Sequence, residues 1–257
     1  REGLRQRLGA LLGAETDEVA FVRNTTEGVV AIAMGFPWRR DDRVVLYTGE
    51  FPTNVTPWLS AAEAHGLEPV FLTSSDFASS TTQGLERLED TLRAGARLVA
   101  VSAVSFQTGR CMPLKAMAAL CHAHGAVLFV DAIQALGVVP INVREAGIDF
   151  LAAGGHKWLM GPEGTGVLYA ARDQAAQLVP RVAGWLSHEE PLDFLFGGEG
   201  LLRYDKPLKR DVSFVEAGVP NALGFAALDA SVSLLLQVGI ETIWQHANQW
   251  NDALEAG

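Results

Sequence analysis

Two charged side chains near the middle of the sequence could act together on a carbonyl compound. Asp131 follows the apolar run 126–130, and Lys157 follows the apolar run 150–153. A carboxylate at the end of a buried strand is costly unless a cation or several donors pair with it. A lysine held among apolar neighbours has a lowered pKa, and its neutral amine attacks aldehydes and ketones to form Schiff bases. We therefore expect Lys157 to be a buried, nucleophilic amine.

An aldehyde cofactor that carries a ring nitrogen would use both groups. Pyridoxal phosphate needs a lysine for its Schiff base and an acid that pairs with its pyridinium nitrogen. Taken alone, Lys157 would more often be a surface lysine, and Asp131 would more often cap a helix. Their combination predicts a site for pyridoxal phosphate, and the motifs around them strengthen this prediction.

These motifs are Asp131-x-x-Gln134, His156-Lys157, Gly161-Pro162-x-Gly164-x-Gly166, Asn24-Thr25-Thr26-Glu27, Phe51-Pro52-Thr53-Asn54 and Glu216-x-Gly218-x-Pro220-Asn221. Together they resemble the class V, fold-type I pyridoxal-phosphate enzymes over nearly the whole chain. This superfamily includes cysteine desulfurases, selenocysteine lyases, kynureninases and isopenicillin N epimerase-like proteins. The stretch 154–158, Gly-Gly-His-Lys-Trp, is most similar to the epimerase-like branch.

The resemblance implies a role for each matching residue. Lys157 would form the Schiff base and then move protons at the substrate carbon. Asp131 would keep the ring nitrogen protonated, and Gln134 would hydrogen-bond the phenolic oxygen of the ring. Thr25 and Thr26 would hold the phosphate through backbone amides at a helix start, where anions bind readily.

Two further residues complete the predicted site, and two others depart from the family pattern. His156 would line the phosphate or ring side, and Phe51 would stack on the ring face. Family members often carry Ser where this chain has Gly154. They also carry a Thr, which reaches the phosphate of the partner subunit, where this chain has Val219.

The function implied by the resemblance is that of a pyridoxal-phosphate enzyme acting on a small amino acid, with aminotransferase or β-lyase (desulfurase-like) chemistry. An epimerase of the isopenicillin N epimerase-like kind is one alternative. A non-catalytic family member that acts as a structural partner is another, because of Gly154 and Val219. A nucleotide-binding sheet domain is disfavoured, because the glycine loop 161–166 lacks the Gly-Lys-Ser/Thr ending. Family members usually dimerise, so we expect a homodimer.

The elements that must position this site are predicted by short apolar runs between helical patterns. The seven candidate strands are 19–22, 43–47, 69–72, 97–102, 126–130, 150–153 and 166–169. Uniformly apolar strands that alternate with helices predict an α/β fold with a mainly parallel, seven-stranded sheet sandwiched by helices. In such sheets ligands bind at the carboxyl ends of the strands. The resemblance identifies this as the large domain of fold type I.

We expect one cofactor-binding domain over 1–257, with 181–221 as a surface excursion. The N-terminal segment and the C-terminal small domain of the family are expected to be absent from this chain.

Composition excludes several other classes of protein. The 257 residues are 49% hydrophobic, which is too apolar for a disordered chain, and the formal net charge of −10 disfavours binding to nucleic acid. No uncharged apolar run of 18 residues occurs, so no membrane span is expected. The only cysteines, Cys111 and Cys121, form no disulfide framework and favour a reducing, cytoplasmic setting. No metal site is expected, since His122 and His124 do not share a helix face.

Overall fold

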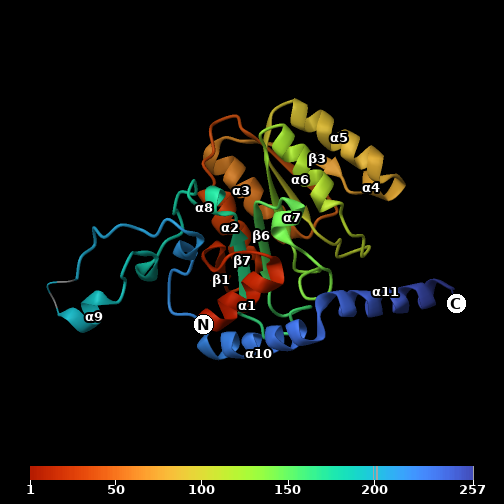
Figure 1. Cartoon of the computed structure of the whole chain (residues 1–257). Coiled ribbons are helices and arrows are strands. Elements are labelled where there is room, and N and C mark those ends of the chain that lie inside the picture. Colours follow the sequence, from red (N-terminus) through yellow and green to blue (C-terminus); the bar gives the residue numbers. More distant parts are fainter. Residues whose placement is uncertain (199, 201, 257) are drawn as a thin grey trace.

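A computed structural model describes residues 1–198, 200 and 202–256 (Figure 1). The strands are β1 (Val19–Val22), β2 (Arg43–Thr48), β3 (Glu68–Thr73), β4 (Ala96–Ser102), β5 (Val127–Asp131), β6 (Phe150–Gly154) and β7 (Gly166–Ala170). The longer helices are α1 (Glu2–Leu12), α2 (Thr25–Gly35), α3 (Thr56–His65), α5 (Thr81–Arg93), α6 (Leu114–Ala123), α10 (Ala222–Val238) and α11 (Ile240–Ala256). Shorter helices are η1 (Thr16–Glu18), η2 (Pro52–Asn54), α4 (Ser75–Ser79), α7 (Val143–Ala146), α8 (Arg172–Ala175), η3 (Trp185–Ser187), α9 (Asp193–Gly197) and η5 (Val212–Val215).

The seven strands form one sheet in the order β1-β7-β6-β5-β4-β2-β3. The five strands from β6 to β3 run parallel to one another, whereas β7 is antiparallel to both β6 and β1. The predicted α/β fold with a mainly parallel, seven-stranded sheet is therefore confirmed. The five parallel strands end at the same edge of the sheet, so the loops that follow them meet there.

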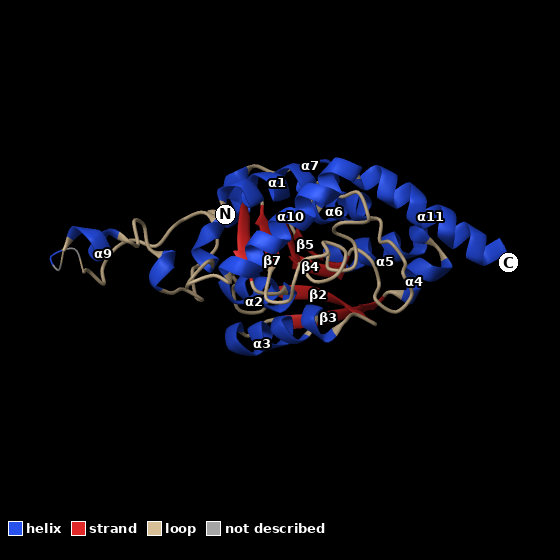
Figure 2. Ribbon diagram, turned by 90° about the horizontal axis from the view of Figure 1, so that it is seen from below, coloured by secondary structure: helices blue, strands red, loops and turns tan. Residues whose placement is uncertain are grey.

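Helices cover both faces of the sheet (Figures 1 and 2). One buried cluster joins the sheet to α1, α5, α6 and α10, and a second cluster joins it to α2, α3 and η5. Strand β5 shows why the central strands are apolar throughout: Leu128 and Val130 belong to the first cluster, and Phe129 belongs to the second. All three side chains are fully buried.

Helix α2 lies close against β6 because Gly28 has no side chain. A Cβ atom at Gly28 would lie only 2.8 Å from the Cβ of Ala152 on β6. This close approach brings the first residue of α2 to the end of the strand, where the hydroxyl of Thr25 accepts a hydrogen bond of 2.9 Å from the amide of Gly154. The packing of one helix thus sets a wall of the site described below.

We expect Gly28→Ala to lower the free energy of unfolding by about 1–3 kcal/mol, the usual cost of overpacking a core. Gly3→Ala in α1 is the matched control, because there a Cβ would approach only the guanidinium of Arg7, at 3.1 Å. The control should be neutral or stabilising by up to about 1 kcal/mol, since Ala favours helix over Gly. Urea unfolding of both variants checks this, and equal destabilisation of the two would contradict it.

The segment 181–221 differs from the rest of the chain. Its described residues hold the short helices η3, α9 and η5 and no strand, and Figures 1 and 2 show α9 projecting away from the body. The predicted excursion also includes residues 199 and 201, which lie outside the described residues. Beyond it, α10 packs against α1, whereas α11 has no buried residue and extends from the body.

No single helix in the described ranges is long and apolar enough to cross a membrane. Helices α10 and α11 meet the length and composition of a span only as a pair, with a bend of 78° between them.

Candidate active site

A cavity of about 260 Å³ lies at the carboxyl edge of the sheet, and all seven predicted site residues line it. These residues are Thr25, Thr26, Phe51, Asp131, Gln134, His156 and Lys157. They come from segments spread over 133 positions of the sequence, so only the fold brings them together. Asp131 and Gln134 follow β5, His156 and Lys157 follow β6, Phe51 follows β2, and the two threonines open α2.

Asp131 is the last residue of β5 and is only 2% exposed. Burial raises the pKa of its carboxyl to about 7, because the charged form loses its hydration. The amide of Ile133, which donates to Oδ1 at 3.0 Å, counteracts this rise, as does the charge of Lys157, whereas the charge of Glu50 adds to it. Among the described residues Oδ2 has no hydrogen-bond partner, so the buried carboxyl can still bind a cationic donor in the cavity.

Lys157 lines the cavity as predicted, but the prediction that it is buried among apolar neighbours is wrong. Its side chain is exposed, and the neighbouring Trp158 and Met160 are about half exposed. The cause is local: β6 ends at Gly154, and the chain then turns outward at the edge of the sheet, where the amide of Gly161 donates to the carbonyl of Gly155 at 2.7 Å. Lys157 therefore stands at the mouth of the cavity rather than in its floor.

Helix α2 starts directly after Asn24. Asn24 is the N-cap, and its Oδ1 accepts from the amide of Glu27 at 2.8 Å. The hydroxyl of Thr25 is engaged by β6, and the hydroxyls of Thr26 and Thr53 lie 2.9 Å apart. Because the first amides of a helix have no partner inside it, those of Thr25 and Thr26 are available to an anion in the cavity.

Phe51 begins the turn η2 and is 49% exposed, so it belongs to the cavity wall rather than to the core. Its ring meets the ring of Phe106 edge to face, with centroids 5.3 Å apart. Sequence reasoning missed Phe106, which lies in an irregular loop after β4 and carries no motif. It also missed Ser102, another lining residue, although its place at the end of β4 matches that of Asp131 and could have indicated it.

The glycine that departs from the family pattern is closely surrounded. A Cβ atom at Gly154 would lie 2.9 and 3.0 Å from two ring atoms of His156, and 3.3 Å from the hydroxyl of Thr25. A serine at this position would therefore require the imidazole to move. The imidazole of His156 can occupy its present position because Gly154 has no side chain.

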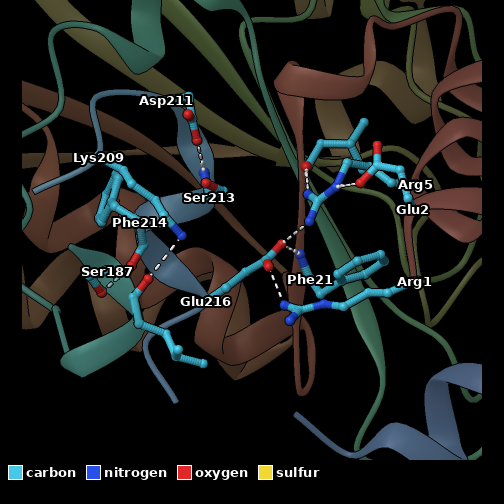
Figure 3. Close-up of polar contacts among 12 residues, drawn as sticks. Arg1, Glu2, Arg5, Phe21, Ser187, Lys209, Asp211, Ser213, Phe214 and Glu216 are labelled. Carbon is cyan, nitrogen blue, oxygen red and sulfur yellow. Dashed lines mark hydrogen bonds and ion pairs between the residues drawn. The ribbon is translucent and has the colours of Figure 1, made fainter. Parts of the chain in front are cut away.

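The downstream motif has a structural role in this chain (Figure 3). The carboxylate of Glu216 accepts from the amide of Phe21 at 2.9 Å, and it forms ion pairs with Arg5, at 2.8 Å, and with Arg1. Arg5 also lies over the ring of Phe21, 4.6 Å from its centroid. Glu216 thus joins the end of the excursion to α1 and β1. Val219 is 83% exposed and lies outside the cavity lining.

The chain is an α/β protein with a cavity at the carboxyl ends of its parallel strands. A lysine, a buried aspartate and the N-terminus of a helix line this cavity. The sequence profile described as "Aminotransferase class-V" matches residues 1–257. The chain belongs to the class-V aminotransferase family.

Individual relatives agree with this assignment. A protein of Methanothermobacter thermautotrophicus named "Probable cysteine desulfurase" is 32% identical over 252 residues, which cover 98% of this chain and 60% of the relative. The crystal structure of the cysteine desulfurase CsdA from Escherichia coli matches with a TM-score of 0.82 and 26% identity, over 94% of this chain and 58% of that one. The chain thus spans about three fifths of the length of these relatives.

A mutant of the cystine lyase C-DES with glycine covalently linked to its PLP cofactor has a TM-score of 0.82 at 24% identity, over 95% of this chain and 62% of that one. This likeness shows the fold alone.

Proposed function

We propose that this chain is the pyridoxal-phosphate-binding part of an enzyme with β-lyase chemistry of the cysteine desulfurase kind, acting on a small amino acid. The observation that carries the proposal is the meeting of Lys157 and Asp131 in one cavity at the carboxyl ends of parallel strands. The names of the relatives support a desulfurase rather than an aminotransferase or an epimerase. They also favour a catalytic role over that of a structural partner.

The residues present suit this cofactor. The floor of the cavity holds a carboxyl whose Oδ2 lacks a partner among the described residues, and a protonated ring nitrogen would supply the missing donor. At another wall, the start of α2 offers amides to a phosphate. Gln134 can hydrogen-bond a phenolic oxygen, and Phe51 presents an exposed ring on which a flat heterocycle can stack.

When bound, pyridoxal phosphate supplies an electron sink for negative charge at the substrate's α carbon. The chain's own groups bind, orient and move protons around it. Asp131 holds a proton at the ring nitrogen, and Thr25 and Thr26 fix the phosphate end. Lys157, at the cavity mouth, is placed to remove and return a proton at the α carbon, while Phe51 excludes water from one ring face.

Exchange of the α hydrogen tests this function without requiring the complete reaction. The purified chain, supplied with pyridoxal phosphate in D2O, should exchange the α hydrogen of L-cysteine or L-alanine for deuterium, as followed by proton NMR. Release of sulfide from L-cysteine would then identify the β-lyase step. A protein that binds the cofactor but exchanges no amino acid would reject catalysis and leave the structural-partner alternative.

We expect Phe51→Ala to weaken the binding of pyridoxal phosphate about 3- to 10-fold, because an offset aromatic stack contributes about 0.5–1.5 kcal/mol. Phe71→Ala is the matched control: Phe71 lies on β3, outside the cavity lining, and is similarly exposed, at 46% against 49%. Absorbance titrations measure both affinities. Equal affinities for the two variants would remove Phe51 from the site.

We further propose that the chain forms a homodimer through the excursion 181–221. The projecting α9 region exposes large apolar side chains, with Phe196 at 86% and Tyr204 at 87%, and a second copy could cover them. Within the excursion, an isolated antiparallel β-bridge joins His188 to Leu208, and Lys206 forms an ion pair of 3.0 Å with Asp193.

The double variant Phe196→Ser, Tyr204→Ser should shift the mass measured by light scattering from dimer to monomer. A wild-type monomer, or a dimer that survives both changes, would contradict the proposal.

The reducing, cytoplasmic setting inferred from Cys111 and Cys121 stays a prediction.

A further inference from the structure

A carboxylate behind the cavity wall connects several parts of the site. Glu50 directly precedes Phe51 and follows Gly49, whose φ of 85° turns the chain sharply after β2. Its Oε1 accepts from the amide of Ser102 at 2.7 Å, and its Oε2 accepts from the hydroxyl of the same residue. Oε2 also accepts from the side-chain amide of Asn54 at 3.3 Å. One half-buried side chain thus joins the end of β4 to the turn that carries Phe51.

The groups that Glu50 holds lie next to the proposed reactive residues. Ser102 pairs in register with Asp131 on the neighbouring strand, and the amide of Ala103 donates to the Asp131 carbonyl at 2.8 Å. Asn54 is fully buried, its own amide donates to the carbonyl of Phe51 at 2.8 Å, and its Oδ1 accepts from the indole of Trp58. The turn η2 is therefore fixed from both sides.

We propose that Glu50 is a positioning residue of this site. It holds the turn that carries Phe51 against β4, and its negative charge near Asp131 makes the cavity floor favour a cationic ring. The proposal rests on the function proposed above for the cavity. The titratable groups around Asp131 are Glu50 from the loop after β2 and Lys157 and His156 from the turn after β6. The Glu50 charge also acts on the phenol of Tyr47: burial raises the pKa of Tyr47, and the charges of Cys121, Glu50 and Asp76 add to the rise.

Glu50→Gln separates the charge from the shape of this side chain. The amide oxygen can still accept from the amide of Ser102, and the new amide nitrogen can donate to the Ser102 hydroxyl, but the negative charge is lost and so is the acceptor for Asn54. Glu68→Gln is the matched control, because Glu68 is an exposed glutamate on β3 that pairs with Arg43 at 2.7 Å and lies outside the cavity lining.

The first measurement needs no cofactor. In the full chain freed of bound cofactor, carboxyl 13C NMR should show Asp131 titrating at a pH lower by about half a unit or more in Glu50→Gln, since a nearby like charge disfavours ionisation. Glu68→Gln should leave that midpoint unchanged. If both variants titrate like the wild type, the proposal is overturned.

A second variant covers the case in which Glu50→Gln does not fold. Glu50→Ala removes the same charge without placing a polar group beside Ser102, so it too should lower the pH at which Asp131 titrates. An unmoved Asp131 midpoint in Glu50→Ala would equally overturn the proposal.

The clamp itself is measured by affinity. Pyridoxal phosphate should bind Glu50→Gln about 3- to 10-fold more weakly than Glu68→Gln, the equivalent of one lost hydrogen bond. Failure of the wild type to bind the cofactor would reject the proposed function, while the NMR titration would still decide the role of Glu50.

Discussion

Lys157→Ala should lose the visible absorbance that the wild type gains with pyridoxal phosphate. The wild-type amine can condense with the cofactor aldehyde, and borohydride should then fix the cofactor to the peptide that contains Lys157. Alanine offers no nitrogen, so the variant can hold the cofactor only through noncovalent contacts with the start of α2 and the cavity walls. Exchange of the substrate α hydrogen should fall about 10²- to 10⁴-fold, the range for loss of a positioned proton-transfer group.

Lys115→Ala is the control for this change. Lys115 is also exposed, but it lies on α6 and outside the cavity lining, so its loss should change neither absorbance nor exchange. Because Lys157 is exposed, its replacement should alter the free energy of unfolding by less than about 0.5 kcal/mol. A Lys157→Ala protein that keeps the wild-type absorbance and a borohydride-stable adduct would show that another amine holds the cofactor.

The strands could be predicted because burial on both faces leaves a continuous apolar run, as at Leu128, Phe129 and Val130. A polar residue at the end of such a run then stands out. Asp131 and Lys157 could be found in this way, since a parallel sheet brings its carboxyl ends to one edge. The glycine at 28 gave no such signal, although the close approach of α2 to β6 depends on it.

Side-chain environment was less predictable than position. The burial expected for Lys157 depended on apolar neighbours in sequence, but Trp158 itself turns outward at the strand end. Phe106 and Glu50 act through contacts with residues that are distant in sequence, and a single sequence does not encode such pairs locally. The hydrogen bond from the Gly154 amide on β6 to the hydroxyl of Thr25 likewise joins residues 129 positions apart, and only the fold reveals it.

Asp131→Asn should make the cofactor-free chain more stable than the wild type at pH 8. The unfolded chain releases the Asp131 proton near the ordinary pKa of 3.8, whereas the folded chain, in which burial penalises the anion, holds it up to about 7. Between these values the folded state binds more protons, so the wild-type free energy of unfolding falls as pH rises. The loss is at most about 4 kcal/mol.

Asparagine has no proton to release, so the variant should lack this part of the pH dependence. Urea unfolding at pH 5 and pH 8 measures it as the difference between the two proteins. Burial also raises the pKa of Asp149, but Asp149 is present in both proteins, so its contribution cancels in the difference. A wild-type and a variant curve that run parallel from pH 5 to pH 8 would contradict the placement of a protonated carboxyl in the cavity floor.

The same change should act in the opposite sense on function. The proposed cofactor brings a ring cation to the floor of the cavity, and that cation would stabilise the Asp131 anion which burial disfavours in the empty site. Asparagine cannot hold the ring nitrogen protonated, so α-hydrogen exchange should fall about 10²- to 10⁴-fold while the chain grows more stable. A gain in stability together with a loss of exchange is expected of a group placed for chemistry at a cost to folding. A purely structural aspartate would lose stability on replacement and leave exchange unchanged.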